Sequence, residues 1–283
     1  MRYALITVIE SNDNNLNKQR SEGNTHKKGL YEDEALVCFK SWRQKAGWLK
    51  DIEIYAYCPT RNTISENTKR ELELLGVNYI ENFLEETDTY FSGFWNVPLC
   101  CKVLEETIDA DILIHTDLDM NVIKPLDKKL VDSVIGGSVV CGQYDALAAR
   151  HQRSMGDDWD LPLDTGLIIS ERKQGFFKFF YDVLSEATKT NGDKRWQDNS
   201  EGVPKHYLEE YVIDKAYNEK EFPIRPLKYY QIGEWYTSVD DLTDTELGQV
   251  CFWHEHIDYD TNAYDKIQEK ISYSKRMRSI NDK

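Results

Sequence analysis

The sequence has few basic residues and no long apolar run. No apolar stretch among its 283 residues approaches the length of ~18 residues that a membrane-spanning helix requires. Residues 1–9 are apolar, but this stretch is too short and runs too directly into polar sequence for a secretory signal. Lys and Arg total 35 against 50 Asp and Glu, and the net charge of −15 repels nucleic-acid phosphate and anionic membranes. We therefore predict a cytoplasmic protein that has no transmembrane segment and binds no nucleic acid.

Paired cysteines are also lacking. The six cysteines show no Cys-x-x-Cys spacing, and most lie within apolar segments, where a free thiol behaves as a small hydrophobic group. This pattern indicates reduced core residues, and neither a zinc site nor disulfide bonds. No internal repeat or low-complexity tract occurs, and a chain that is 40% hydrophobic can bury one full core. We expect a single domain over residues 1–283.

Strand and helix patterns alternate through the first half of the chain. Short β-rich apolar runs are separated by stretches that carry apolar residues at helical spacing. The expected strands are 3–9, 52–57, 77–80 and 111–116, and the expected helices are 32–45, 65–75 and 97–107. Further strands are expected at 138–142 and 167–169, with a helix at 175–188. This order predicts an α/β fold in which helices flank a doubly wound, mostly parallel, Rossmann-like sheet.

The apolar strand 111–116 runs directly into Asp117-Leu118-Asp119. In open α/β sheets, ligands bind where the parallel strands end. Two carboxylates spaced i and i+2 at such a point can bind one hard divalent cation, whose other positions suit phosphate oxygens and water. The cation would also offset the charge of a diphosphate, which this acidic chain otherwise repels. The alternative is a solvated acidic turn, which is common in proteins.

This acidic turn, together with the Ile123-Lys124-Pro125 turn after it, resembles the Asp-x-Asp motif of GT-A glycosyltransferases, especially of their glycogenin-like branch. The resemblance extends in matching order from residue 3 to about residue 256. It implies a GT-A fold with a nucleotide-binding part at about 1–125 and a sugar and acceptor part at about 126–270. It also implies a nucleotide-sugar donor, whose diphosphate lies beside the metal.

The resemblance assigns one group of residues to donor binding. In the family, the first strand holds the base and ribose, largely through main-chain groups, and a helix lysine binds phosphate. A lysine is a suitable point charge for a diphosphate, and a glycine lets the backbone approach a ligand closely. The matching residues here are Thr7, Val8, Ile9, Lys102, Asp117, Leu118 and Gly166. For Lys102 and Gly166, an exposed helix lysine and an ordinary turn before a strand are the alternatives.

A second group matches positions around the sugar. Asp164 precedes Gly166 in an Asp-Thr-Gly element that resembles the family's Asn/Asp-Ser/Thr-Gly segment, and its carboxylate could accept bonds from sugar hydroxyls. Glu209 and Glu210 lie in a helix, 207–217, that resembles the one carrying an acidic pair beneath the sugar ring. Either glutamate could act as the catalytic carboxylate, and an acidic second residue favours inverting over retaining transfer. A solvated acidic first turn is the alternative.

A histidine near the end of the chain completes the expected metal site. His254 and His256 are two residues apart on a predicted strand and so share one face. The resemblance implies that one of them binds the metal; we favour His254, with His256 as the second choice. Two carboxylates with one imidazole favour Mn²⁺, with Mg²⁺ as the alternative.

The sequence therefore predicts a metal-dependent glycosyltransferase. It would move a sugar from a nucleotide diphosphate donor, most simply a UDP-sugar, to a hydroxyl group on a glycan or protein acceptor. Two other functions stay open: a nucleotide-sugar hydrolase or pyrophosphatase with the same metal site, and a non-catalytic nucleotide-sugar-binding module. The donor sugar, the acceptor and the oligomeric state are not determined by the sequence.

Overall fold

The computed structural model describes residues 1–12, 31–84, 92–143, 163–197, 216, 222–228, 231–232 and 251–254. The strands of its main sheet are β1 (Tyr3–Val8), β2 (Glu53–Cys58), β3 (Val77–Glu81), β4 (Ile112–Thr116), β6 (Val139–Gln143), β7 (Leu163–Glu171) and β8 (Ile224–Lys228). A second sheet contains β5 (Met120–Val122), β9 (Gln231–Ile232) and β10 (Phe252–His254). The α-helices are α2 (Tyr31–Lys45), α3 (Glu66–Leu74), α4 (Ser92–Thr107), α5 (Lys128–Asp132) and α7 (Phe176–Gln197). The short 3₁₀ helices are η1 (Gly47–Leu49) and η3 (Arg172–Gln174).

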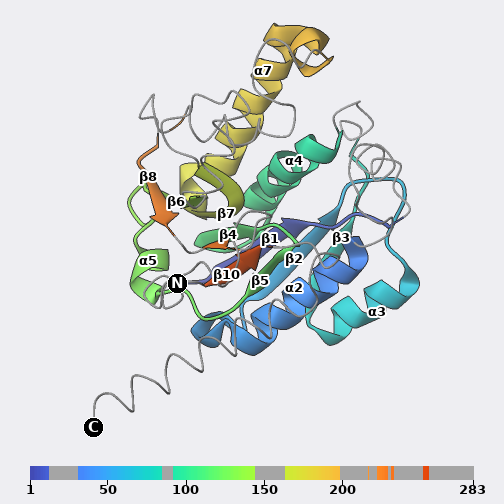
Figure 1. The fold of residues 1–283 in the computed structure, drawn as a ribbon, viewed down its shortest axis with the longest axis vertical. Helices are drawn as coiled ribbons and strands as arrows, with labels where there is room; N and C mark the ends of the chain where they lie inside the picture. The colour runs from blue at the N-terminus through green and yellow to red at the C-terminus, as the bar shows by residue number, and fades with distance from the viewer. Residues whose placement is uncertain are drawn as a thin grey trace.

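The main sheet has the strand order β3-β2-β1-β4-β7-β6-β8 (Figure 1). Its pairings β1/β2, β2/β3, β1/β4 and β6/β8 are parallel, whereas β7 runs antiparallel to both β4 and β6. The predicted helix-flanked, mostly parallel α/β sheet is therefore confirmed. From β1 the chain continues outward to β2 and β3, and then returns to add β4 on the other side of β1. This reversal makes the carboxyl ends of β1 and β4 the topological switch point, where such sheets bind ligands.

Helices cover both faces of the main sheet (Figure 1). One buried cluster joins the sheet to α2, α3 and the second sheet, and includes Phe39, Trp42, Leu72 and Phe252. The other joins the sheet to α4 and α7. Successive residues of β1 alternate between the two, since Leu5 belongs to the first and Ile6 to the second. All six cysteines are free and buried, as their apolar surroundings predict.

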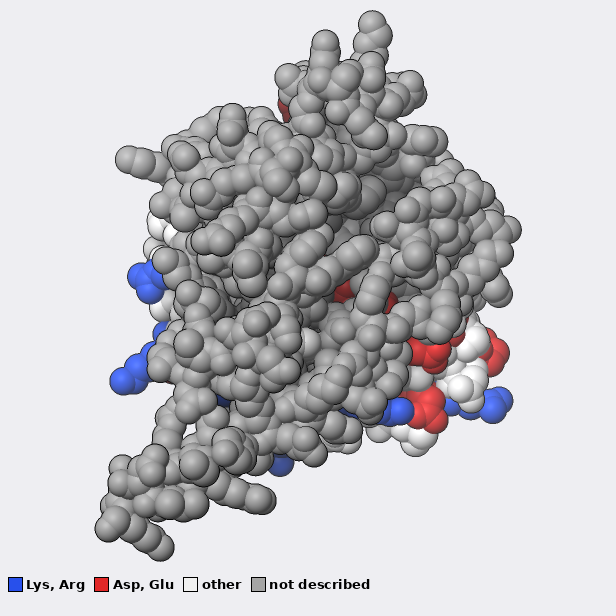
Figure 2. Space-filling model, viewed as in Figure 1, with Lys and Arg blue, Asp and Glu red and all other residues white. Residues whose placement is uncertain are grey.

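Local signals in the sequence account for several element boundaries. Ser65 caps α3 by accepting a hydrogen bond from the Thr68 N–H at 3.2 Å. Gly76 follows the C-terminus of α3 with φ +65°, a conformation that favours glycine. In α3, Lys69 pairs with Glu66 at 2.9 Å and with Glu81 of β3 at 3.0 Å. Figure 2 shows acidic and basic side chains intermixed on the surface near α3. Within the part of the chain that the structure describes, no helix has the length and apolar character of a membrane span.

The structure extends or adds to several predicted elements. The strand predicted at 167–169 covers Leu163–Glu171, and the helix predicted at 175–188 continues to Gln197. In the second sheet, β10 was predicted, whereas β5 and β9 were not. The division of the chain into nucleotide and acceptor parts near residue 125 stays a prediction.

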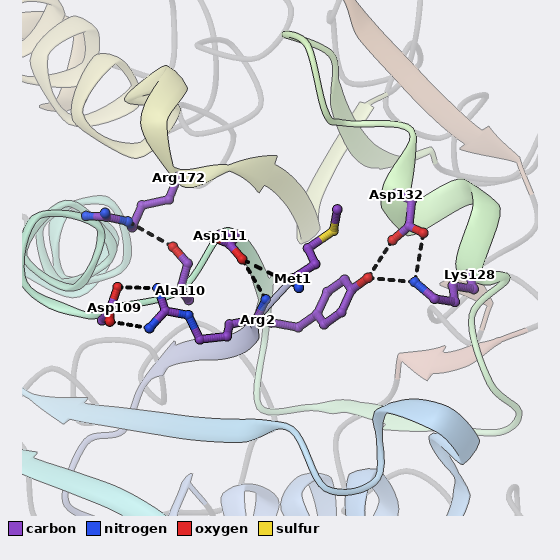
Figure 3. A network of polar contacts seen from close by, with 9 residues as sticks. Met1, Arg2, Asp109, Ala110, Asp111, Lys128, Asp132 and Arg172 are labelled. Atoms are coloured by element: carbon purple, nitrogen blue, oxygen red, sulfur yellow. Dashed lines mark hydrogen bonds and ion pairs between the residues drawn. The ribbon is translucent and has the colours of Figure 1, made fainter.

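A polar network joins the beginnings of β1 and β4, at the edge of the sheet opposite the acidic turn (Figure 3). The backbone N–H of Arg2 donates to Asp111 at 2.7 Å, and the Arg2 guanidinium pairs with Asp109. Nε of Arg172 donates to the Ala110 carbonyl at 2.9 Å. These bonds join the segments that lead into the two central strands, whose register is set by their own parallel pairing.

Candidate functional site

The acidic turn lies between the two sheets. β4 of the main sheet ends at Thr116 and β5 of the second sheet begins at Met120, so Asp117-Leu118-Asp119 is the connection between them. The Met120 N–H donates to the Asp117 carbonyl at 3.3 Å and closes the turn. Leu118 packs against the hydrophobic core. Asp117 and Asp119 are both half-buried, and the side chain of Asp117 is 35% exposed.

Backbone contacts bring three sequence-predicted segments together at this turn. The Asp117 N–H donates to the Gly166 carbonyl of β7 at 3.0 Å. The hydroxyl of Thr7, in β1, is buried and donates to the Thr116 carbonyl at 2.8 Å. On the other side, Sγ of Cys38 in α2 lies 3.9 Å from the Asp117 carbonyl oxygen. The turn is therefore held from β1, β7 and α2 at once.

The late strand β10 borders the same turn. It pairs antiparallel with β5, with His254 opposite Met120, and the Ile123 N–H donates to the Cys251 carbonyl at 2.7 Å. Because Met120 directly follows Asp119, the backbone of His254 lies near the end of the acidic turn. The side chain of His254 and the whole of His256 lie outside the described residues, so the identity of the histidine ligand stays a prediction.

A buried histidine stands directly behind Asp117. His115, in β4, is 1% exposed, and its Nε2 lies 3.3 Å from Oδ1 of Asp117. Its Nδ1 lies 3.1 Å from the Ile6 carbonyl and 3.6 Å from Sγ of Cys101. Burial of the ring opposes its protonation, but the neighbouring Cys101 and Asp117 raise the pKa of His115 well above its usual value. A protonated ring would present an N–H to both the Ile6 carbonyl and the Asp117 carboxylate.

A second polar pair lies just beyond the end of β1. Asn96, near the start of α4, is fully buried, and its amide donates to the carboxylate of Glu10. Its Oδ1 is also buried and has no hydrogen-bond partner among the residues that the structure describes. A buried, unsatisfied oxygen costs free energy, which makes this amide a candidate to meet a ligand at the switch point.

The other residues predicted to bind the donor include Val8, Ile9 and Lys102. Val8 and Ile9 are buried, and the Ile9 N–H donates to the Tyr57 carbonyl at 3.0 Å. Nζ of Lys102 lies 4.5 Å from the centroid of the Tyr181 ring, between α4 and α7. Lys102 is six residues, or about 9 Å along the helix axis, from Asn96 at the switch-point end of α4. Phosphate binding by Lys102 stays a prediction.

The sugar-side predictions fall largely outside the described residues. The backbone of Asp164 lies in β7 opposite Gly142, but its side chain is not among those described, and neither Glu209 nor Glu210 is. Two carboxylates at one turn suit a hard cation. The described side chains contain no group of three that could hold a metal, so further ligands would have to come from residues such as His254 or from the donor itself.

Comparisons with known proteins give a match at the level of structure alone. No family model and no curated protein sequence matches the chain. Among solved structures, mouse xyloside xylosyltransferase 1, in its apo form, superposes with a TM-score of 0.52 at 12% sequence identity. The match covers 92% of this chain and 99% of the mouse chain.

The chain has a GT-A-like glycosyltransferase fold. In this GT-A-like fold, the acidic turn after β4, Gly166 of β7 and the backbone of His254 lie together at the switch point. The likeness does not distinguish the glycogenin-like branch, which stays a prediction. Sequence reasoning missed His115 and Asn96. The alternation of strand side chains could have found His115, because residues i and i+2 share a face and His115 is two residues before Asp117.

Proposed function

We propose that this protein is a metal-dependent glycosyltransferase that transfers a sugar from a nucleotide diphosphate donor, a UDP-sugar, to a hydroxyl group of a glycan or protein. One observation carries the proposal. In a GT-A-like fold, two half-buried aspartates, Asp117 and Asp119, occupy the turn after the central strand β4, and the backbone of this turn lies next to Gly166 and near the backbone of His254. The name of the structural neighbour, a xylosyltransferase, supports the same reaction class.

In this proposal, Asp117, Asp119 and His254 would hold Mn²⁺, which supplies charge stabilisation for the departing diphosphate. The fixed backbone of the turn limits the movement of both carboxylates, so little reorganisation is needed when the donor binds. Lys102 would add positive charge near the phosphates. Asp164 would orient the sugar, and Glu209 or Glu210 would accept the proton of the attacking hydroxyl.

Thermal unfolding with a panel of nucleotide sugars, with and without Mn²⁺, tests the proposal. A ligand that binds only the native state raises stability by about 2.7 kcal/mol at a hundredfold excess over its Kd. We expect a UDP-sugar to raise the Tm only when Mn²⁺ is present, and Asp117→Asn and Asp119→Asn each to abolish that rise without unfolding the protein. Chelator should have the same effect as either variant.

Asp111→Asn is the matched control. Asp111 precedes the same strand at its other end, where its carboxylate is 49% exposed and bonds to Arg2. The Asp111→Asn variant should keep the full Mn²⁺-dependent rise in Tm. If Asp117→Asn or Asp119→Asn responds like the control, the site assignment is wrong. Release of free sugar at the full turnover rate, without an acceptor, would instead indicate a nucleotide-sugar hydrolase.

A further inference from the structure

His115 is a buried polar side chain beside the acidic turn that the proposed reaction does not use. It lies in β4 two residues before Asp117, which directly follows the strand, so strand alternation places the two side chains on the same side. Its Nε2 lies 3.3 Å from Oδ1 of Asp117, within ion-pair distance, and makes no hydrogen bond to the described residues. The ring therefore brings its second nitrogen close to a carboxylate proposed to bind metal.

Three elements fix the His115 ring in this orientation. The Ile6 carbonyl of β1 lies 3.1 Å from Nδ1, and Sγ of Cys101 in α4 lies 3.6 Å from the same nitrogen. The ring of Phe177 in α7 packs against it edge-on, with the two centroids 6.4 Å apart. With the ring held on these sides, Nε2 has little freedom to move away from Asp117.

Packing alone does not account for an imidazole at this position. The surrounding cluster is apolar, with Ile6, Leu104, Leu113 and Phe177 all fully buried. An aliphatic or phenyl side chain would fill such a space without the cost of burying two ring nitrogens. The contact of Nδ1 with the Ile6 carbonyl offsets part of this cost, and the contact of Nε2 with Asp117 offsets the rest.

We infer that His115 is a positioning residue that holds the Asp117 carboxylate in its metal-binding orientation. With Oδ1 next to Nε2, Oδ2 would be available to the cation of the proposed function. The inference rests on that proposed function. Removing a side chain that orients a metal ligand in this way commonly weakens metal binding about 10- to 100-fold.

Two substitutions separate the two nitrogens of His115. The amide of Asn reaches approximately the position of Nδ1, so His115→Asn can keep the contact with Ile6 and lose the one with Asp117. The amide of Gln reaches approximately the position of Nε2, so His115→Gln can keep the contact with Asp117. His115→Phe retains the ring and its packing on Phe177 but removes both nitrogens, and it serves if the Asn variant does not fold.

The experiment measures Mn²⁺ affinity by calorimetric titration in the presence of UDP, together with the free energy of unfolding without metal. We expect His115→Asn and His115→Phe to weaken Mn²⁺ binding about tenfold or more, and His115→Gln to recover most of that loss. A structural role would instead make affinity follow stability across all three variants.

The outcomes distinguish this inference from the proposed function. If wild-type protein binds Mn²⁺ and Asp117→Asn abolishes binding, but His115→Asn and His115→Phe bind as tightly as the wild type, only the positioning role is wrong. If Gln weakens binding as much as Phe does, the contact with Asp117 is not the cause, and the inference also fails. If wild-type protein binds no Mn²⁺, or Asp117→Asn changes nothing, the proposed metal site itself is wrong.

Discussion

Glu105 of α4 is a charged residue with a structural role outside the acidic turn. It is 5% exposed, and its carboxylate accepts hydrogen bonds from the N–H groups of Phe177 at 3.1 Å and Lys178 at 2.9 Å, at the start of α7. Burial favours the neutral acid more strongly than these donors favour the anion, and it raises the pKa of Glu105 from 4.5 to about 7. The contact thus joins the two helices that cover one face of the sheet.

This pKa predicts how stability depends on pH. The native state binds the Glu105 proton more tightly than the unfolded chain does, so this contribution is complete below about pH 4.5 and is lost as pH rises through about 7. A difference of this size corresponds to about 3 kcal/mol. Glu105→Gln mimics the neutral acid at every pH. We expect the variant to gain stability relative to wild type between pH 4.5 and 8, measured by urea unfolding across that range; parallel profiles would contradict the assignment.

The candidate site could be predicted at some residues and not at others. Asp117 and Asp119 were predictable because an apolar strand ends directly at them, and strand ends bind ligands. Gly166 was predicted from a motif, and its carbonyl does contact the Asp117 N–H at 3.0 Å. Asn96 was not predictable, because its burial depends on the packing of α4 against the end of β1 rather than on any local pattern.

At the scale of elements, the 3₁₀ helix η1 packs on the segment that follows the acidic turn. Gly47 begins η1 with φ +61°, and a Cβ built there would lie 2.5 Å from Cγ of Pro125. Gly175 caps η3 with φ +68°, and apart from its chain neighbours no atom of the described residues lies within 4 Å of a Cβ built there. The two glycines therefore have similar backbone conformations and different surroundings.

This comparison predicts unequal costs for the same substitution. Gly175→Ala should lose about 1 kcal/mol, from left-handed backbone strain alone. Gly47→Ala should lose about 2–4 kcal/mol, because displacement of Pro125 adds an overpacking cost of about 1–3 kcal/mol. Urea denaturation of the two variants at one pH measures both losses. Equal losses would show that Pro125 moves away from the added Cβ with no loss of stability.

Element prediction succeeded where the sequence pattern was long enough. The alternating strand and helix patterns of residues 3–116 match β1 to β4 and α2 to α4. The second sheet contains strands of only two and three residues, which are too short to show a period. The antiparallel direction of β7 likewise depends on its long connections and not on its own apolar sequence.

At the scale of the whole molecule, the net charge of −15 opposes the binding of a diphosphate. Two carboxylates at the acidic turn add to this repulsion locally, so a nucleotide diphosphate should bind weakly unless a cation accompanies it. Raising ionic strength from about 0.01 M to 0.15 M shortens the Debye length from about 30 Å to 8 Å and therefore weakens the repulsion. Salt should consequently affect UDP binding in opposite directions with and without metal.

We predict that added salt tightens metal-free UDP binding by a few-fold and weakens UDP binding when Mn²⁺ is present, because the second case depends on attraction between the cation and both sets of anions. Calorimetric titrations of UDP into the protein at several NaCl concentrations, with either Mn²⁺ or chelator present, measure how the Kd of UDP depends on salt in each case. Uridine, which lacks phosphates, is the control and should bind with little dependence on salt. If salt instead weakens metal-free UDP binding, protein cations such as Lys102 offset the diphosphate charge, and the acidic turn is not the principal electrostatic determinant of donor binding.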